Sequence, residues 1–232
     1  MTPMASGKPT DAACPTCKGP GFVLRATDGS VVACPTCRPA VHRTDLAKSV
    51  GLTPALLDWT AATLHRQQKA AWQKAEALLT PAPHGFLTLW AEPGRGKTGV
   101  AIAAVNRCLA TGIPALFTRT QAMLEHLKDA FSIKDDEGAE LSRRYRRVRD
   151  CAVLVLDEYD RFAGTDWEVA RMSMLINDRN DRRADHLTIL TTNANPQTFE
   201  PYIWSRLSAD GCEVIQVGGK NGVDLRRLDK GA

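Results

Sequence analysis

Five short apolar runs are spaced along the chain from residue 84 onward. Each run is nearly continuous in hydrophobicity rather than alternating, which is typical of strands buried on both faces of a parallel sheet. Polar, helix-forming segments separate the runs, and this order predicts a doubly wound, three-layer α/β domain with a five-stranded parallel sheet. The runs are residues 86–90, 114–118, 151–156, 187–192 and 212–217.

The first eighty residues follow a different pattern. Two short apolar stretches around residues 22–24 and 31–32 flank Asp28-Gly29, which predicts a hairpin. Residues 61–79 are rich in Ala, Gln and Lys and predict a helix, which prolines end before the first strand of the α/β domain. The expected organisation is a small module over residues 1–44, a helical linker over 45–83 and the α/β domain over 84–232.

Composition narrows the class of protein. The chain has 232 residues, 44% of them hydrophobic and 24% charged, with a formal net charge of +4. These values suit one ordinary domain with a small module and exclude a disordered chain, while the charge balance alone does not indicate a nucleic-acid partner. No apolar run has the length of a bilayer span, so we expect a soluble, cytoplasmic protein with no membrane partner.

Four of the seven cysteines form two matched pairs, Cys14-Pro-Thr-Cys17 and Cys34-Pro-Thr-Cys37, with sixteen residues between them. This spacing is within the range of tetrahedral zinc sites, and four thiolates indicate a closed, structural site. The segment has too few large apolar side chains for a core, so Zn²⁺ is expected to supply most of its folding free energy. A zinc ribbon is predicted, with two disulfides or a redox pair as the alternative.

A glycine-rich loop joins the first apolar run to a predicted helix. Gly94 and Gly96 allow the backbone amides to approach a phosphate closely, and the helix that follows directs its positive end there. Lys97 is expected to contact the β- and γ-phosphates of ATP, and the Thr98 hydroxyl to bind Mg²⁺. The loop begins with Ala91 where the usual pattern has glycine. The expected nucleotide-binding residues are Glu92, Pro93, Gly94, Arg95, Gly96, Lys97, Thr98 and Gly99.

Two carboxylates end the third apolar run. Ligands of open α/β sheets bind at the carboxyl ends of the strands, so Asp157 and Glu158 are expected beside the glycine-rich loop. Asp157 would hold Mg²⁺, and Glu158 would polarise the attacking water as a general base. A pair that caps a helix N-terminus is the alternative.

Residues 91–98, 153–158 and 191–193 resemble Walker A, Walker B and sensor I of AAA+ ATPases in order and spacing. Within that class the chain resembles the DnaC-type helicase loaders and is similar to the IstB-type transposition helpers. The segments that carry this narrower likeness are Ser49 to Leu52 with Trp59-Thr60, Asn177 to Asn180, Ser205 to Leu207, Gly218-Gly219 and Asp224 to Arg226.

The resemblance implies roles for three further residues. Asn193 would orient the lytic water, Arg206 would be an arginine finger offered to the γ-phosphate of a neighbouring subunit, and Arg226 would occupy the sensor II position. Arg179 is the alternative finger. About forty residues follow Asn193, so the helical lid is expected to be short or absent, which puts Arg226 in doubt. A site shared between subunits predicts a homo-oligomer, in a ring or a spiral.

The densest basic segment lies in an insertion-like stretch over residues 118–150. In the family this region carries an extra helix that touches single-stranded DNA, and arginines around an aromatic ring suit phosphate neutralisation and base stacking. A solvated amphipathic helix is the alternative. The expected DNA-binding residues are Arg143, Arg144, Tyr145, Arg146 and Arg147.

The function implied by the resemblance is that of an ATP-dependent loader of a replicative DNA helicase. Such a protein grips the helicase through its N-terminal module and contacts single-stranded DNA through its ATPase domain, with ATP as a switch. The alternative is an IstB-like helper ATPase that forms filaments on duplex DNA and recruits a transposase. In a third hypothesis the zinc ribbon itself binds DNA.

Overall fold

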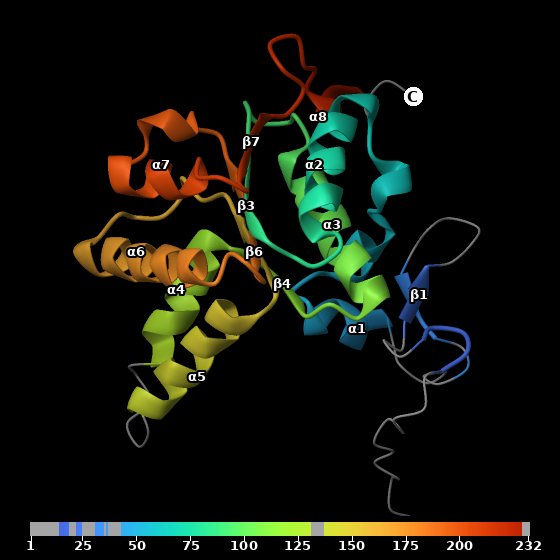
Figure 1. The fold of residues 1–232 in the computed structure, drawn as a ribbon, viewed down its shortest axis with the longest axis horizontal. Helices are drawn as coiled ribbons and strands as arrows, with labels where there is room; N and C mark the ends of the chain where they lie inside the picture. The colour runs from blue at the N-terminus through green and yellow to red at the C-terminus, as the bar shows by residue number, and fades with distance from the viewer. Residues whose placement is uncertain are drawn as a thin grey trace, which may run out of the picture.

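The computed structural model describes residues 14–18, 22–24, 31–34, 36, 43–130 and 137–228. Its centre is a five-stranded sheet in the order β4-β5-β6-β3-β7, with every neighbouring pair parallel (Figure 1). The predicted α/β class and all five predicted strands are therefore confirmed. The strands are β3 (Gly85–Trp90), β4 (Ala115–Arg119), β5 (Val153–Asp157), β6 (Leu187–Thr192) and β7 (Glu213–Gln216).

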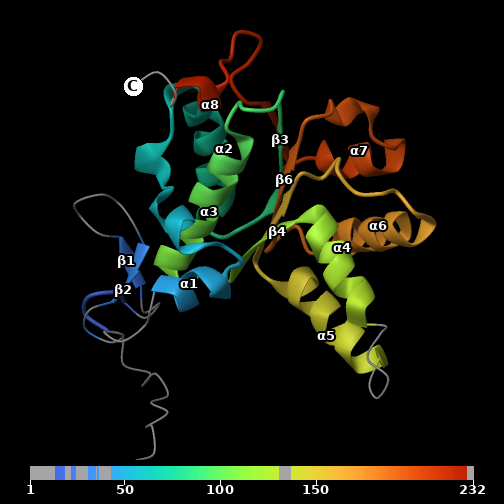
Figure 2. The same cartoon turned by 180° about the vertical axis from the view of Figure 1, so that it is seen from behind.

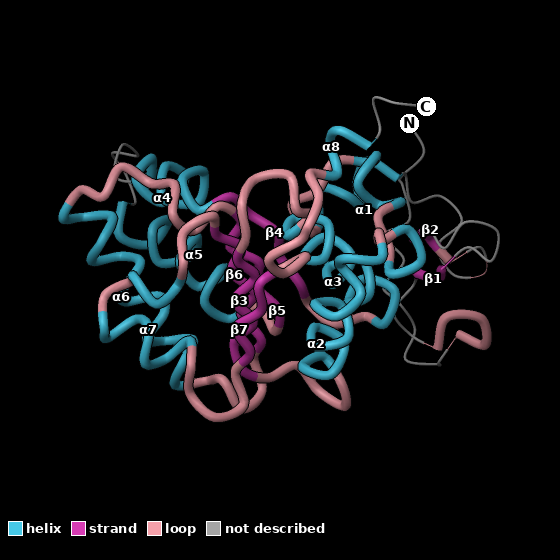
Figure 3. Tube along the Cα trace, turned by 90° about the horizontal axis from the view of Figure 1, so that it is seen from above, coloured by secondary structure: helices cyan, strands magenta, loops and turns pink. Residues whose placement is uncertain are grey.

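Helices cover both faces of this sheet, which Figure 3 shows edge-on. Successive residues of a strand enter opposite cores: Phe86 packs with α4 to α7, whereas Leu87 and Leu89 pack with α1 to α3. Among the described residues no helix combines the length and hydrophobicity that a bilayer span needs. The helices are α1 (Arg43–Ser49), α2 (Lys69–Leu79), α3 (Lys97–Thr111), α4 (Thr120–Asp129), α5 (Glu137–Asp150), α6 (Asp166–Asp181), α7 (Pro201–Leu207) and α8 (Leu225–Leu228).

The strand register brings distant segments to one edge of the sheet. Trp90 at the end of β3 lies opposite Thr192 at the end of β6. Asp157 ends β5, the other neighbour of β6. The loops that leave these three strands therefore meet, and they carry the glycine-rich loop, the two carboxylates and Asn193.

The single helix predicted over residues 61–79 is wrong in its first half. Two 3₁₀ turns, Ala61–Thr63 and Arg66–Gln68, precede α2. The Thr63 hydroxyl accepts a hydrogen bond from the backbone N–H of Thr60 at 3.0 Å, and the side-chain Oε1 of Gln68 accepts one from the N–H of His65 at 2.8 Å. Polar side chains that bind the backbone in this way compete with helical hydrogen bonding and start a new turn each time. Two further 3₁₀ turns are Pro54–Asp58 and Pro196–Thr198.

The predicted N-terminal hairpin is confirmed. β1 (Phe22–Leu24) pairs antiparallel with β2 (Val31–Ala33). The hairpin contacts α3, the helix that follows the glycine-rich loop, and β2 also contacts α1 (Figure 2). A module with little core of its own thus rests on the α/β domain.

Candidate functional site

Lys97 is held inside the glycine-rich loop. Its ammonium donates hydrogen bonds to the carbonyl oxygens of Ala91 at 2.8 Å and Glu92 at 3.1 Å, and to Asn193 Oδ1 at 2.9 Å. Desolvation lowers the pKa of Lys97, while the nearby carboxylates of Asp160 and Asp157 oppose the shift. The structure thus places a buried cation where the sequence predicts a phosphate contact.

The two glycines of the loop have positive φ angles, +82° at Gly94 and +90° at Gly96. A side chain at either position would be strained by the backbone angle alone. It would also collide with neighbours, because a Cβ on Gly94 would lie 1.9 Å from Asp224 Oδ1 and one on Gly96 would lie 2.6 Å from Gln68 Nε2. Glycine is required at both positions by conformation and by space.

Residues far away in sequence brace the loop from outside. Gln68 Nε2 donates to the Gly96 carbonyl at 2.7 Å. Gln67 Nε2 donates to the carbonyls of Arg95 and Val223, and the Leu225 N–H donates to the Gly94 carbonyl. Sequence reasoning missed these braces, because no local pattern marks a glutamine that becomes a brace only through the tertiary fold.

Asp157 and Thr98 form the candidate magnesium site. The Asp157 carboxylate is 4% exposed, and its Oδ1 accepts hydrogen bonds from the hydroxyls of Thr98 at 2.9 Å and Thr191 at 2.6 Å. A carboxylate and a hydroxyl are hard oxygen donors, and Mg²⁺ usually takes only one or two protein ligands beside waters and phosphates. The residues present therefore fit the predicted metal.

Glu158 sits beside this pair with a left-handed backbone, φ +54°. Its N–H donates to Thr191 Oγ1 at 3.0 Å, and the next N–H, of Tyr159, donates to the Thr191 carbonyl. The carboxylate is partly exposed and lies 3.8 Å from Arg161. A non-glycine residue in this conformation is uncommon and often marks a functional position, which suits the predicted general base.

Asn193 lies between two charged groups. Its Oδ1 accepts from Lys97, while its backbone N–H and its Nδ2 point to the Asp160 carboxylate at 3.1 and 3.5 Å. Sequence reasoning missed Asp160. The one available signal is its position three residues after Asp157, on the same loop.

These residues surround one cavity of about 890 Å³, a volume suited to a nucleotide. The glycine-rich loop, Asp157, Glu158 and Asn193 line one part of it. Its lining also includes the apolar side chains of Leu56, Trp59 and Leu64, with Trp59 45% exposed. Charged phosphate-binding groups and apolar side chains thus line a single cleft.

The three arginines with predicted roles lie in different environments. Arg226 on α8 lines the cavity. Arg206 does not line it; its guanidinium lies 3.8 Å from the ring centroid of Tyr202 and donates to that residue's carbonyl at 2.9 Å. The Nε of Arg206 is buried and unpartnered, so this side chain has an unused donor.

The alternative prediction, that Arg179 is the arginine finger, is wrong. Its side chain is only 1% exposed and cannot reach another subunit. The guanidinium donates to Thr188 Oγ1 at 2.6 Å and to backbone carbonyls at the end of α5 and the starts of β5 and β6. It therefore stabilises the packing of α5 against the sheet.

Three of the four predicted zinc cysteines come together. The sulfur atoms of Cys14, Cys17 and Cys34 lie within 4.8 Å of one another, and those of Cys14 and Cys34 are 3.7 Å apart. Two ligands of a tetrahedral zinc with Zn–S bonds of about 2.3 Å are about 3.8 Å apart. Hydrogen bonding to the backbone of Cys17 and Thr16 lowers the pKa of the Cys14 thiol. The donor set fits Zn²⁺; Cys37, the fourth predicted ligand, lies outside the described residues.

A second cavity of about 770 Å³ lies at the open edge of the sheet, between α1, β4, α4 and α5. We call it the basic groove. Burial and nearby Arg144 lower the pKa of its one histidine, His126, and its one acid is Glu140. The basic residues that line it are Lys48, Arg119, His126, Arg143, Arg144 and Arg147.

Tyr145 is not available for base stacking, so that part of the DNA-binding prediction is wrong. The ring is 8% exposed, and its hydroxyl donates to Asp178 Oδ2 at 2.9 Å. The neighbouring arginines differ in exposure and in their ion pairs. Arg143 is 68% exposed, whereas Arg144 is largely covered and pairs with Glu140 at 2.6 Å.

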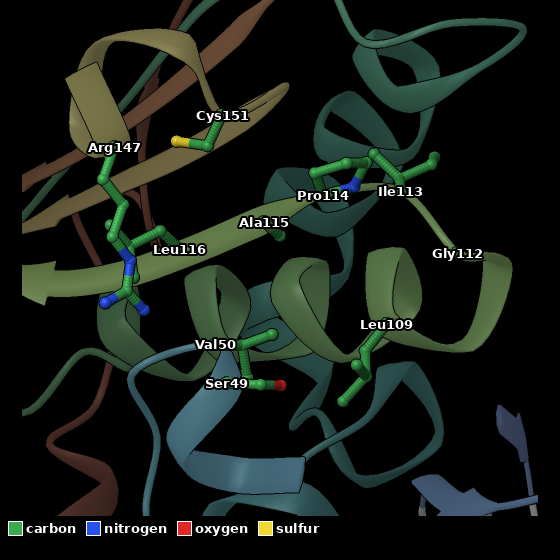
Figure 4. Close-up of a pocket in the computed structure, with 10 residues that line it drawn as sticks. All are labelled: Ser49, Val50, Leu109, Gly112, Ile113, Pro114, Ala115, Leu116, Arg147 and Cys151. Atoms are coloured by element: carbon green, nitrogen blue, oxygen red, sulfur yellow. The ribbon is translucent and has the colours of Figure 1, made fainter. Parts of the chain in front are cut away.

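Arg147 also lines a smaller cavity of about 350 Å³ (Figure 4). Its side chain extends from α5 over β4 in the close-up, toward the segment that holds Ser49 and Val50. The remaining walls are largely apolar, from Leu109 and from the start of β4. This cavity extends the basic groove toward the amino end of β4.

Comparison with known families gives one match within the chain. The model of the IstB-like ATP binding protein family matches residues 83–208, which is more than half of the 232 residues. No curated protein sequence matches the chain.

Solved structures share the fold. The DnaC helicase loader superposes with a TM-score of 0.58 at 21% identity, over 70% of this chain and 98% of that chain. DnaI gives a TM-score of 0.58 at 18% identity, over 79% and 99%. The replication initiator DnaA, bound to AMPPCP and single-stranded DNA, gives 0.55 at 18% identity, over 68% and 49%, so the chain spans about half of that protein.

Proposed function

Because the chain belongs to the family of IstB-like ATP binding proteins, we propose that it is an ATP- and Mg²⁺-dependent ATPase that loads a replicative DNA helicase onto single-stranded DNA. The observation that carries the ATPase part is the single cleft that unites Lys97, Asp157, Glu158 and Asn193. Contacts within the cleft hold the side chains of Lys97, Asp157 and Asn193, and the backbone of Glu158 is fixed by its N–H bond to Thr191, as phosphoryl transfer requires of positioned groups.

The proposed division of roles follows the geometry. Lys97 contacts the β- and γ-phosphates, and Thr98 with Asp157 would hold Mg²⁺, which would supply positive charge to the phosphates. Glu158 takes the proton of the attacking water, and Asn193 orients that water. Arg226 contacts the phosphates from the same subunit.

Arg206 is proposed to complete the cleft of a neighbouring subunit. It lies outside its own cleft and carries a buried, unpartnered Nε. An arginine that acts in trans makes the active site depend on a homo-oligomer, in a ring or a spiral. Mixing Arg206→Ala subunits with Lys97→Ala subunits tests this. In a mixed oligomer some interfaces carry both defects and others carry neither, so the intact interfaces should recover ATPase turnover that each variant alone lacks.

Single-stranded DNA is proposed to bind in the basic groove. Arg119, Arg143 and Arg147 give it positive charge, and a flexible strand needs charge along a track more than fixed partners. The fold likeness to the DnaA structure that holds single-stranded DNA is consistent with this assignment.

The N-terminal module is proposed to be a zinc ribbon that grips the helicase. Cys14, Cys17 and Cys34 would hold Zn²⁺, and the sequence proposes Cys37 as the fourth ligand. Loss of Zn²⁺ on chelation would unfold the module and leave the α/β domain folded, since that domain has its own core.

A pull-down of the zinc-loaded full chain with the replicative helicases of its host or phage tests the loader. Retention of one helicase, lost in Cys14→Ser, supports the proposal, and failure to retain any of them contradicts it. Imaging with ATP tests the alternative in parallel. Short spirals on single strands agree with a loader, whereas long filaments on duplex DNA would make the chain a transposition helper.

A further inference from the structure

The side-chain amide of Asn193 has one chemically allowed orientation. Its oxygen faces the Lys97 ammonium at 2.9 Å, and its nitrogen faces the Asp160 carboxylate at 3.5 Å. An ammonium only donates hydrogen bonds and a carboxylate only accepts them, so a flipped amide would oppose like partners on both sides. The two charged neighbours therefore fix an orientation that coordinates alone often leave open.

Asp160 also holds the backbone of Asn193. The second carboxylate oxygen accepts the Asn193 N–H at 3.1 Å, so both the main chain and the side chain of Asn193 depend on one residue. Asp160 is itself exposed, yet its loop is fixed. Tyr159, which precedes it, is buried against Phe162 and Phe199 and donates its N–H to the Thr191 carbonyl.

Lys97 has no spare proton in this arrangement. Its three N–H groups meet the carbonyls of Ala91 and Glu92 and the Asn193 oxygen. A phosphate that approaches Lys97 must displace one of these acceptors. The two carbonyls belong to the loop backbone, so the side chain of Asn193 is the acceptor that can give way.

We propose that Asp160 is a positioning residue that holds Asn193 with its carbonyl oxygen toward the phosphates. That oxygen accepts from Lys97 before the nucleotide binds and from the lytic water afterwards. Asp160 touches neither nucleotide nor water and takes no part in bond making. The inference rests on the proposed ATPase function and deepens it by naming the residue that orients the water-binding group.

The test compares full-length Asp160→Ala with wild type and with Asp210→Ala, a matched change at an exposed aspartate of the turn before β7. Affinity for AMPPCP with Mg²⁺ is measured by calorimetry and turnover by phosphate release. We expect Asp160→Ala to bind AMPPCP about three-fold more tightly, because Asn193 is no longer held against Lys97 and gives way to the phosphate, and because a negative charge leaves the phosphate surroundings. Turnover falls about ten-fold, because the water is no longer oriented. Tighter binding with slower turnover is not the signature of a folding defect, and an unchanged melting temperature excludes one.

A double variant tests whether Asp160 acts through Asn193. If it does, Asn193→Ala/Asp160→Ala has the kcat of Asn193→Ala alone. Multiplied losses in the double variant, or an Asp160→Ala protein with wild-type kcat and affinity, overturn the inference.

The outcomes separate the inference from the proposed function. A wild type that binds AMPPCP but splits no ATP contradicts the proposed hydrolysis. The affinity change then decides the inference: tightening in Asp160→Ala supports it, and unchanged or weaker binding overturns it. A wild type that does not bind AMPPCP contradicts both.

Discussion

The nucleotide cleft and the basic groove hold their charged groups in opposite ways. In the cleft, Lys97 contacts three oxygens and Asp157 accepts from two hydroxyls, all largely shielded from solvent. In the groove, Arg143 is exposed and shares Glu140 with Arg144.

This difference matches what each region is proposed to bind. Transfer of a phosphoryl group needs reacting atoms placed within fractions of an ångström, so fixed side chains are useful. A single strand of nucleic acid changes shape as it moves, so a track of charge on adaptable side chains is enough. Single substitutions should therefore have large effects in the cleft and small, cumulative effects in the groove.

Glu158→Gln should show the largest effect. We expect turnover to fall by about 10³-fold because the water loses its base, while ATP affinity stays near the wild-type value. Gln accepts the same left-handed backbone as poorly as Glu, so the loop is not relaxed by the change. Single-turnover phosphate release with saturating ATP measures this, and unchanged turnover would remove Glu158 as the base.

Lys97→Ala should weaken binding of AMPPCP with Mg²⁺ by about 10²-fold, because a charge-assisted contact to the phosphates is lost. Calorimetry measures the affinity. Lys220→Ala, at an exposed lysine in the loop after β7, is the control and should bind normally. A loss of AMPPCP affinity below ten-fold for Lys97→Ala would show that nucleotide binding in the cleft does not depend strongly on this fixed charge.

The double variant Arg143→Ala/Arg147→Ala should weaken single-stranded DNA binding by about ten-fold and leave ATPase turnover intact. Each arginine that contacts a phosphate adds about 0.7 to the slope of log affinity against log salt, so the slope should decrease by about 1.4. Fluorescence anisotropy over a salt series measures both quantities. An unchanged slope would place the DNA elsewhere.

Glu140→Gln should raise affinity for single-stranded DNA by about two-fold. The carboxylate pairs with two arginines of the groove, and its removal frees them for phosphates. The hydrogen bond from Arg144 lowers the pKa of Glu140, so the wild-type carboxylate is charged at neutral pH. The substitution by Gln therefore removes a charge under the conditions of the measurement. Weaker binding would mean that Glu140 positions these arginines instead of competing for them.

Tyr145→Phe should leave DNA affinity unchanged, because the ring is buried and does not meet a base. The lost hydrogen bond to Asp178 should reduce the free energy of unfolding by about 1 kcal/mol, which thermal or urea unfolding measures. A several-fold loss of DNA affinity in a variant of normal stability would return Tyr145 to the binding surface.

Contiguous patterns were predicted well from the sequence. The five strands follow from apolar runs, and the residues from Glu92 to Thr98 form one contiguous motif that a short stretch of sequence displays in full. Asp160 and the bracing glutamines were missed because their roles arise only when separate elements meet. Which distant element a side chain will meet leaves no mark in a short stretch of sequence.

The two errors on single residues have a common cause. Tyr145 shares the buried side of α5 with Leu141 and Val148, and Arg179 shares that of α6 with Met172 and Leu175. Both follow the spacing of three or four residues that marks a helix face toward the core. Their polar groups drew attention to function, whereas their positions in the helical repeat indicate burial.

The buried guanidinium of Arg179 limits how far the basic groove can be redesigned. It binds the backbone carbonyls of Val148, Arg149 and Cys151, and lysine cannot replace it, since a point charge with three protons cannot match a planar fork with five. To make the basic groove bind a different nucleic acid, the exposed arginines of α5 can be varied up to Arg147. From Val148 onward the backbone is held by Arg179 and leads directly into β5, which starts at Val153 and ends at Asp157.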